Sequence, residues 1–139
     1  WRKLSPGATA PNVSLQDGDG NALYLKDLRG KYLYISVWAF SYGEMDKEVR
    51  AEWEKLAEEY KDKNILFATF CMGPSQWLGQ VKNLPGEHYV VNNTNAFYSR
   101  YMISVMPRYM LIDPEGRIVD VDAPKPSSSA KLLLRSVGL

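Results

Sequence analysis

Residues Lys31 to Val49 read K-Y-L-Y-I-S-V-W-A-F-S-Y-G-E-M-D-K-E-V, a strand-like run followed by a short loop and a helical pattern. From Tyr32 to Ala39 almost every side chain is aromatic, β-branched or otherwise apolar, which predicts a strand that helices cover on both faces. From about Gly43 to Lys61 apolar residues recur every three or four positions, which predicts a helix with one buried stripe. We expect the rest of the chain to be built around this strand-to-helix junction.

The start of that helix should be stabilised by polar side chains in the preceding loop and first turn. Ser41 is the expected cap, because a serine oxygen can accept a hydrogen bond from a free backbone N–H group. Glu44 and Asp46 are expected in the first turn, where a carboxylate gains about 0.3 to 1 kcal/mol from the helix dipole.

The composition fits one globular domain spanning residues 1–139. Hydrophobic residues make up 45% and charged residues 24% of the chain, and the net charge of +1 gives no electrostatic reason to expect a nucleic-acid partner. The longest apolar stretches are strand-sized, so no membrane-spanning segment is expected. Because the chain starts at Trp1 without an initiator methionine, we expect it to be a fragment or the mature form of a longer precursor.

Periodicity and turn residues predict the remaining elements. Asn64 to Cys71 reads as a second buried strand, which completes a right-handed βαβ unit with the first strand and helix. His88 is expected at the surface of a short edge strand, H-Y-V-V. The other expected elements are a hairpin at Val13–Leu15 and Ala22–Leu25, a short helix from Pro74, a helix capped by Asn93 or Thr94, a hairpin of Arg108–Ile112 and Arg117–Val121, and a last helix, Ala130–Val137, with Leu132, Leu133 and Val137 facing inward.

Three motifs resemble the TlpA-like thiol-disulfide oxidoreductases of the redoxin (AhpC/TSA) branch of the thioredoxin superfamily, in their Bacteroidetes form. P-G-A-T-A-P-N-V-S-L resembles the family opening, V-W-A-F-S-Y-G-E-M-D-K-E resembles V-W-A-T-W-C-G-P-C-R-K-E, and V-M-P-R-Y-M-L-I-D-P-E-G-R-I-V resembles I-P-R-F-I-L-I-D-K-D-G-K-I-V. The resemblance implies an α/β thioredoxin-like fold, with a central mixed sheet flanked by helices and an N-terminal β-hairpin. It also implies a periplasmic or membrane-anchored location outside the cytoplasm.

The same alignment places other residues where the family has its two reactive cysteines. Tyr42 and Met45 occupy the two cysteine positions, Gly43 matches the glycine between them, and Glu44 replaces the proline. Thiol-disulfide exchange needs an exposed thiolate and a second thiol that releases the mixed disulfide. A phenol and a thioether can do neither, so we expect a redox-inactive pseudoenzyme without a cofactor.

A binding groove is the function that the resemblance leaves available. Pro107 matches the family's cis-proline, and the backbone beside that proline pairs with peptides in the family by strand addition, which needs no cysteine. A peptide or protein ligand of a monomeric protein is therefore one hypothesis, and a loop that Pro107 merely shapes is the other. The expected groove residues are Trp38, Tyr42, Gly43, Glu44, Met106 and Pro107.

Alternative functions rest on sulfur-containing and aromatic side chains near the same edge of the sheet. Cys71 is either a lone redox thiol or a small apolar core residue. Soft ligands suit Cu(I), so a metal site is a further alternative, against methionines that simply fill space; its ligands would be Met45, Cys71, Met72 and Met106. Another hypothesis is an aromatic pocket of Trp38, Phe40, Tyr42 and Tyr109. In a purely structural domain, the Tyr42 ring would fill the groove.

Overall fold

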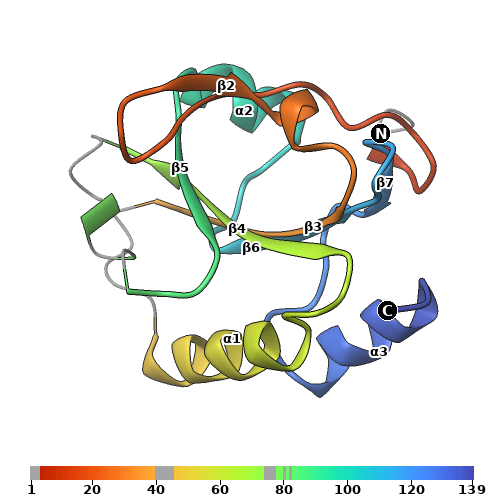
Figure 1. Cartoon of the computed structure of the whole chain (residues 1–139). Coiled ribbons are helices and arrows are strands. Elements are labelled where there is room, and N and C mark those ends of the chain that lie inside the picture. Colours follow the sequence, from red (N-terminus) through yellow and green to blue (C-terminus); the bar gives the residue numbers. More distant parts are fainter. Residues whose placement is uncertain (1–3, 40–45, 74–77, 80, 82) are drawn as a thin grey trace.

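The computed structural model describes residues 4–39, 46–73, 78–79, 81 and 83–139. Three helices, a short 3₁₀ helix and seven strands follow one another along this part of the chain (Figure 1). Their bounds are β1 Ser14–Gln16, β2 Ala22–Tyr24, the 3₁₀ helix η2 Leu25–Leu28, β3 Tyr32–Ala39, α1 Lys47–Glu59, β4 Ile65–Met72, β5 Glu87–Val91, α2 Thr94–Arg100, β6 Arg108–Ile112, β7 Ile118–Asp120 and α3 Ser128–Ser136.

The strands form one mixed sheet in the order β2-β1-β5-β4-β3-β6-β7. Strand β3 lies between the parallel β4 and the antiparallel β6, and β5 continues the parallel part beyond β4. The predicted hairpins are confirmed as the antiparallel pairs β1–β2 and β6–β7. The α/β architecture with a central mixed sheet and an N-terminal hairpin is therefore the predicted one.

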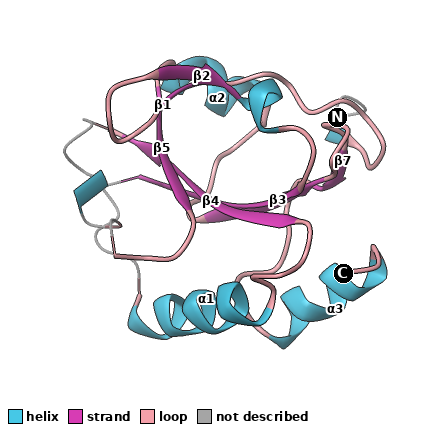
Figure 2. Cartoon of the chain, viewed as in Figure 1, coloured by secondary structure: helices cyan, strands magenta, loops and turns pink. Residues whose placement is uncertain are grey.

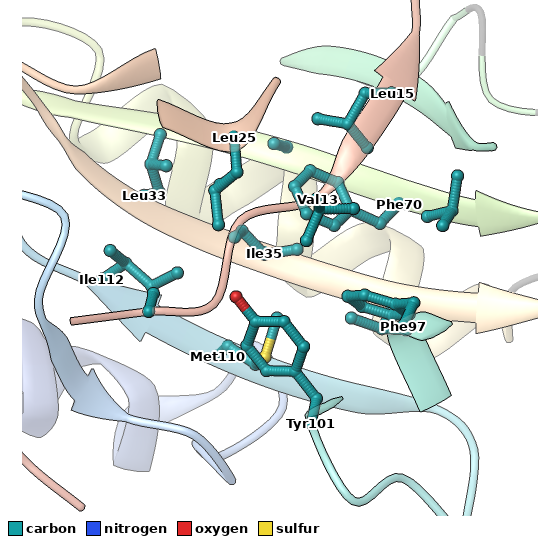
Figure 3. Packing of buried hydrophobic residues seen from close by; sticks show 14 of the residues in the cluster. Val13, Leu15, Leu25, Leu33, Ile35, Phe70, Phe97, Tyr101, Met110 and Ile112 are labelled. Atoms are coloured by element: carbon teal, nitrogen blue, oxygen red, sulfur yellow. The ribbon is translucent and has the colours of Figure 1, made fainter. Parts of the chain in front are cut away.

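Helices cover both faces of the sheet. Figures 1 and 2 show α1 and α3 together below the central strands, with α2 and η2 on the opposite side. Side chains of β3 alternate between two buried clusters. Leu33 and Ile35 belong to the cluster beneath α2, which lies between the sheet and that helix. Tyr34 belongs to the cluster beneath α1, which lies between the sheet and α1. Figure 3 shows the first cluster, in which side chains of β3, β4 and β6 meet those of α2 and the N-terminal segment. The prediction that β3 is buried on both faces is confirmed.

Helix α1 begins at Lys47, about four residues later than predicted. Asp46 has an extended backbone and acts as the N-cap, where its Oδ1 accepts hydrogen bonds from the N–H groups of Glu48 (2.8 Å) and Val49 (3.4 Å). The expectation that Asp46 lies inside the first turn was wrong, because its short carboxylate satisfies two otherwise free donors better from the cap position. Ser41 and Glu44 lie outside the described residues.

The sequence predicted that β5 is an edge strand, but in the structure it has a neighbouring strand on both sides. The N-terminal hairpin adds β1 to its outer side, with Leu15 opposite Val91 and Gln16 opposite Val90. His88 is accordingly partly buried rather than a surface residue. The prediction failed because the covering strand comes from a segment more than seventy positions away in the sequence.

The last helix begins two residues earlier than predicted, and its inward face is partly the predicted one, since Leu133 and Val137 pack against the buried cluster as expected. It covers Ser128–Ser136 with Ser127 as the N-cap, and Ala130 and Leu134 are its fully buried residues. Leu132 is 64% exposed, which corrects the expectation that it faces inward. The buried pair is four positions apart, the spacing that keeps two side chains on one helix face, and Leu132 lies midway between them on the opposite side.

The outcome differs between the two predicted short helices. Helix α2 and its Asn93 cap are confirmed, whereas the helix predicted from Pro74 falls largely outside the described residues. Within the described part of the chain, no helix combines the length and the apolar composition needed to cross a bilayer.

Candidate functional site

The candidate site lies at the edge of the sheet where β3 and β4 end. The two strands are parallel, and Trp38 pairs with Cys71 and Ala39 with Met72 at their C-terminal ends. Strand β6 starts at the same edge, because its first residue, Arg108, pairs with Val37. The fold therefore brings the end of β3 and the loop before β6 together, as expected for a shared site. Tyr42, Gly43, Glu44 and Met45, with Phe40 of the predicted aromatic pocket, lie outside the described residues.

Trp38, one of the predicted groove residues, lies near the end of β3. Its side chain is 7% exposed and belongs to the cluster beneath α1, together with Tyr109. Its indole Nε1 is buried and has no hydrogen-bond partner among the described residues. Trp38 and Tyr109, the two described members of the predicted aromatic pocket, are thus packed in the core.

Cys71 occupies the environment of a core residue. Its side chain is 0% exposed, and burial raises the pKa of its thiol to about 11. A reactive thiol needs the opposite, namely access to solvent and a lowered pKa. The surroundings of Cys71 therefore argue against single-cysteine redox chemistry.

The proposed Cu(I) ligands do not come together. Cys71 and Met72 are successive residues of β4, so their side chains leave opposite faces of the sheet. Cys71 lies in the cluster beneath α1, whereas Met72 lies in the cluster beneath α2, against which Met106 also packs. The sheet therefore separates the cysteine from both methionines, which corrects the hypothesis of one shared site. Met45 lies outside the described residues, and the described residues contain no group of three histidine, cysteine, aspartate or glutamate side chains able to hold a metal.

The loop between α2 and β6 presents apolar residues to solvent. Val105 is 70% exposed and Met102 is 54% exposed, with a left-handed backbone at Met102 (φ 51°). The Met106–Pro107 peptide bond is cis, as predicted, and Pro107 is exposed. Val105 and Met102 were not among the predicted site residues; the signal for them was an apolar run, M-I-S-V-M-P, that continues beyond the end of α2.

Some backbone groups of this loop have no hydrogen-bond partner among the residues that the structure describes. Within the described part of the chain, the N–H and C=O groups of Val105 and Met106 have no hydrogen-bond partner. Strand β6 begins only at Arg108, where the ladder with β3 starts. The loop therefore has, at the same place, exposed apolar side chains and backbone groups without a partner in the described part of the chain.

A row of polar side chains crosses the sheet beneath α1, which the sequence analysis missed. Tyr109, Ser36, Thr69 and His88 are neighbours in register on β6, β3, β4 and β5. Thr69 Oγ1 lies 2.7 Å from His88 Nδ1, and Ser36 Oγ is buried without a partner of ordinary geometry among the described residues. Burial raises the pKa of Tyr109, an effect that the neighbouring Ser36 hydroxyl partly offsets. The signal was a single serine or threonine inside each of two otherwise apolar strands.

Solved structures that resemble this chain define its structural class. A candidate thiol-disulfide oxidoreductase from Bacteroides vulgatus superposes with a TM-score of 0.83 at 29% identity, covering 99% of both chains. The thioredoxin domain of a thiol-disulfide oxidoreductase from the same species superposes with a TM-score of 0.82 at 21% identity, covering 96% of this chain and 98% of that chain. The architecture is therefore that of the thioredoxin-like thiol-disulfide oxidoreductases.

Sequence comparison then gives the family. The redoxin family model matches residues 5–133, so the chain belongs to the redoxin family. The thiol-disulfide oxidoreductase ResA of Bacillus subtilis is 27% identical over 126 residues, which cover 85% of this chain and 67% of that protein. ResA of Bacillus cereus is 24% identical over 123 residues, covering 85% and 69%. The whole sequence of this chain contains one cysteine.

Proposed function

We propose that this redoxin-family protein is a redox-inactive binding domain that holds an extended peptide segment along the loop before β6. The proposal is carried by two features of this loop: backbone groups of Val105 and Met106 that have no partner among the described residues, and exposed apolar side chains at Met102 and Val105. Free N–H and C=O groups beside a sheet are what strand addition uses, because main-chain hydrogen bonds supply the affinity.

The loop favours an apolar partner segment. In an added strand successive side chains point to opposite sides, so every second side chain of the peptide would face the loop. Val105 and Met102 would lose exposed apolar surface on contact, and methionine adapts its shape to different partners. An uncharged, apolar-rich peptide therefore fits the loop better than an acidic or basic one.

Removing the apolar contact should weaken peptide binding. We expect short unstructured apolar-rich peptides to shift the amide NMR signals of Val105 and Met106, and Val105→Asp to weaken binding about tenfold, a loss of about 1.4 kcal/mol. Leu132→Asp is the matched control, because Leu132 is also exposed but lies on α3. Equal losses in both variants, or signal shifts confined to other loops, would contradict the proposal.

The absence of a cysteine pair predicts the outcome of a redox assay. Because the only cysteine is buried with a raised pKa, we expect the purified protein to reduce insulin disulfides no faster than the buffer with its reductant. The Cys71→Ser variant should give the same rate. A variant carrying both Tyr42→Cys and Met45→Cys serves as the comparison that contains a dithiol. A wild-type rate near that of an ordinary thioredoxin would refute redox inactivity.

The proposal includes a monomeric protein outside the cytoplasm, in the periplasm or anchored to a membrane. This part rests on the family resemblance alone. Cell fractionation of the native source, with the protein recovered in the cytoplasmic fraction, would contradict it.

A further inference from the structure

The Leu84–Gly86 turn, which leads into β5, is held by at least one contact at each residue. The side chain of Leu84 is buried, and its N–H group donates to the carbonyl of Val81 over 2.9 Å. The carbonyl oxygen of Leu84 lies 2.7 Å from Nε2 of His88, and that of Pro85 accepts a hydrogen bond from Nε1 of Trp53 at 2.8 Å. Gly86 packs directly against the backbone carbonyl of Phe67. Among these contacts, only the one made by His88 contains a group that titrates near neutral pH.

The hydrogen bonds of His88 fix one form of its ring. A carbonyl oxygen can only accept, so Nε2 must carry the hydrogen that bonds to Leu84. In the neutral ring Nδ1 is then an acceptor, and the Thr69 hydroxyl donates to it over 2.7 Å. Both ring nitrogens are satisfied in this single neutral tautomer.

Protonation disturbs this arrangement on the Thr69 side. A charged ring carries a hydrogen on Nδ1 as well, so Thr69 Oγ1 must become the acceptor and its own hydrogen must turn to another oxygen. Thr69 is fully buried, and the neighbouring oxygen in register on β3 is Ser36 Oγ. Protonation of His88 in the closed turn therefore requires the buried hydroxyl groups beside it to reorient. It also requires the charged ring to lose part of its hydration.

We propose that His88 is a proton-sensitive anchor: its neutral ring fastens the Leu84–Gly86 turn to β5, and its protonation favours opening of that turn. In the open turn the ring meets water and binds a proton at its ordinary pKa. The closed turn holds the ring partly buried between Thr69 and Leu84. The open form thus binds protons more readily than the closed form.

The surroundings of His88 both lower and raise its pKa. Burial lowers the pKa of His88 below its usual 6.5, and the positive charge of Arg50 on α1 lowers it further. The adjacent Glu87 and the carbonyl of Leu84 oppose these effects without cancelling them. Because the closed form has the lower pKa, the anchor is at full strength above about pH 6.5, weakens as the pH falls below that value, and stops weakening below the pKa of the closed form.

Heteronuclear NMR of the full chain tests the anchor directly, because His88 is the only histidine. We expect the Nε2–H tautomer at neutral pH and a His88 pKa below 6.5. We also expect the exchange protection of the Leu84 amide and the Trp53 indole N–H to decrease below pH 6.5. Each unit between the open-form and closed-form pKa corresponds to about tenfold in the opening equilibrium.

His88→Gln is the matched variant, since an amide side chain retains a donor for Leu84 but does not titrate. Its protection, corrected for the intrinsic pH dependence of exchange, should be flat over the same range. An Nδ1–H tautomer, a His88 pKa of 6.5 or higher, or the same pH dependence in His88→Gln would overturn the proposal. If the variant does not fold, the tautomer and the pKa of the wild-type ring still decide.

Discussion

Gly86→Ala is expected to lower the free energy of unfolding by roughly 2 to 5 kcal/mol. Gly86 has a φ of +111°, a conformation that costs a residue with a Cβ atom about 1 to 2 kcal/mol. The added Cβ would also overlap the backbone carbonyl oxygen of Phe67 in β4, and backbone in a central strand cannot move aside as a flexible side chain can. Overpacking of this kind typically costs about 1 to 3 kcal/mol more.

Gly30→Ala separates these two effects. Gly30 has nearly the same φ, +113°, but no atom outside its immediate chain neighbours lies within 4 Å of the place where its Cβ would be. It should therefore lose only about 1 to 2 kcal/mol. Urea unfolding of both variants measures the difference, and equal losses would show that the contact with Phe67 has no energetic weight.

Trp53→Ala should have the other large effect, a loss of about 3 to 5 kcal/mol. Trp53 of α1 is fully buried, and its ring lies 5.8 Å from that of Tyr34 and 5.5 Å from that of Phe67, centroid to centroid. The substitution removes most of this buried ring surface and leaves a cavity between α1 and the sheet. It also removes the hydrogen bond to the carbonyl of Pro85.

Trp53→Phe isolates the hydrogen bond from the packing. Phenylalanine retains an aromatic ring in the cluster but has no N–H donor, so the Pro85 carbonyl loses its partner. We expect a loss of about 1 to 3 kcal/mol, clearly smaller than that of Trp53→Ala. Urea unfolding again gives the values. Two variants of equal stability would mean that packing of the Trp53 ring contributes little, contrary to its complete burial.

The fold was largely predictable because its signals are local. The apolar run of β3, the stripe of α1 and the Pro-Gly turn between β6 and β7 each act over a few residues. Each of these elements formed as predicted, apart from the later start of α1. Errors occurred where two local signals compete or where a distant segment intervenes. Asp46 rather than an earlier residue caps α1, and β1 covers β5.

The candidate site was only partly predictable for the same reason. Val105 and Met102 are apolar residues in a loop, and sequence periodicity cannot tell whether such residues are covered. The row beneath α1 combines Ser36, Thr69 and His88, which come from three strands far apart in the sequence. No local pattern reports that their side chains meet.

The sequence by itself determined that this chain has the redoxin architecture and lacks a cysteine pair, because periodicity, turn residues and the identity of residues 42 and 45 are all read directly from it. Only the tertiary structure decided that Cys71 is buried, that Met72 faces the other side of the sheet, and that His88 contacts the carbonyl of Leu84. Burial and hydrogen bonding depend on which distant segments pack against a residue, and strand pairing sets those neighbours.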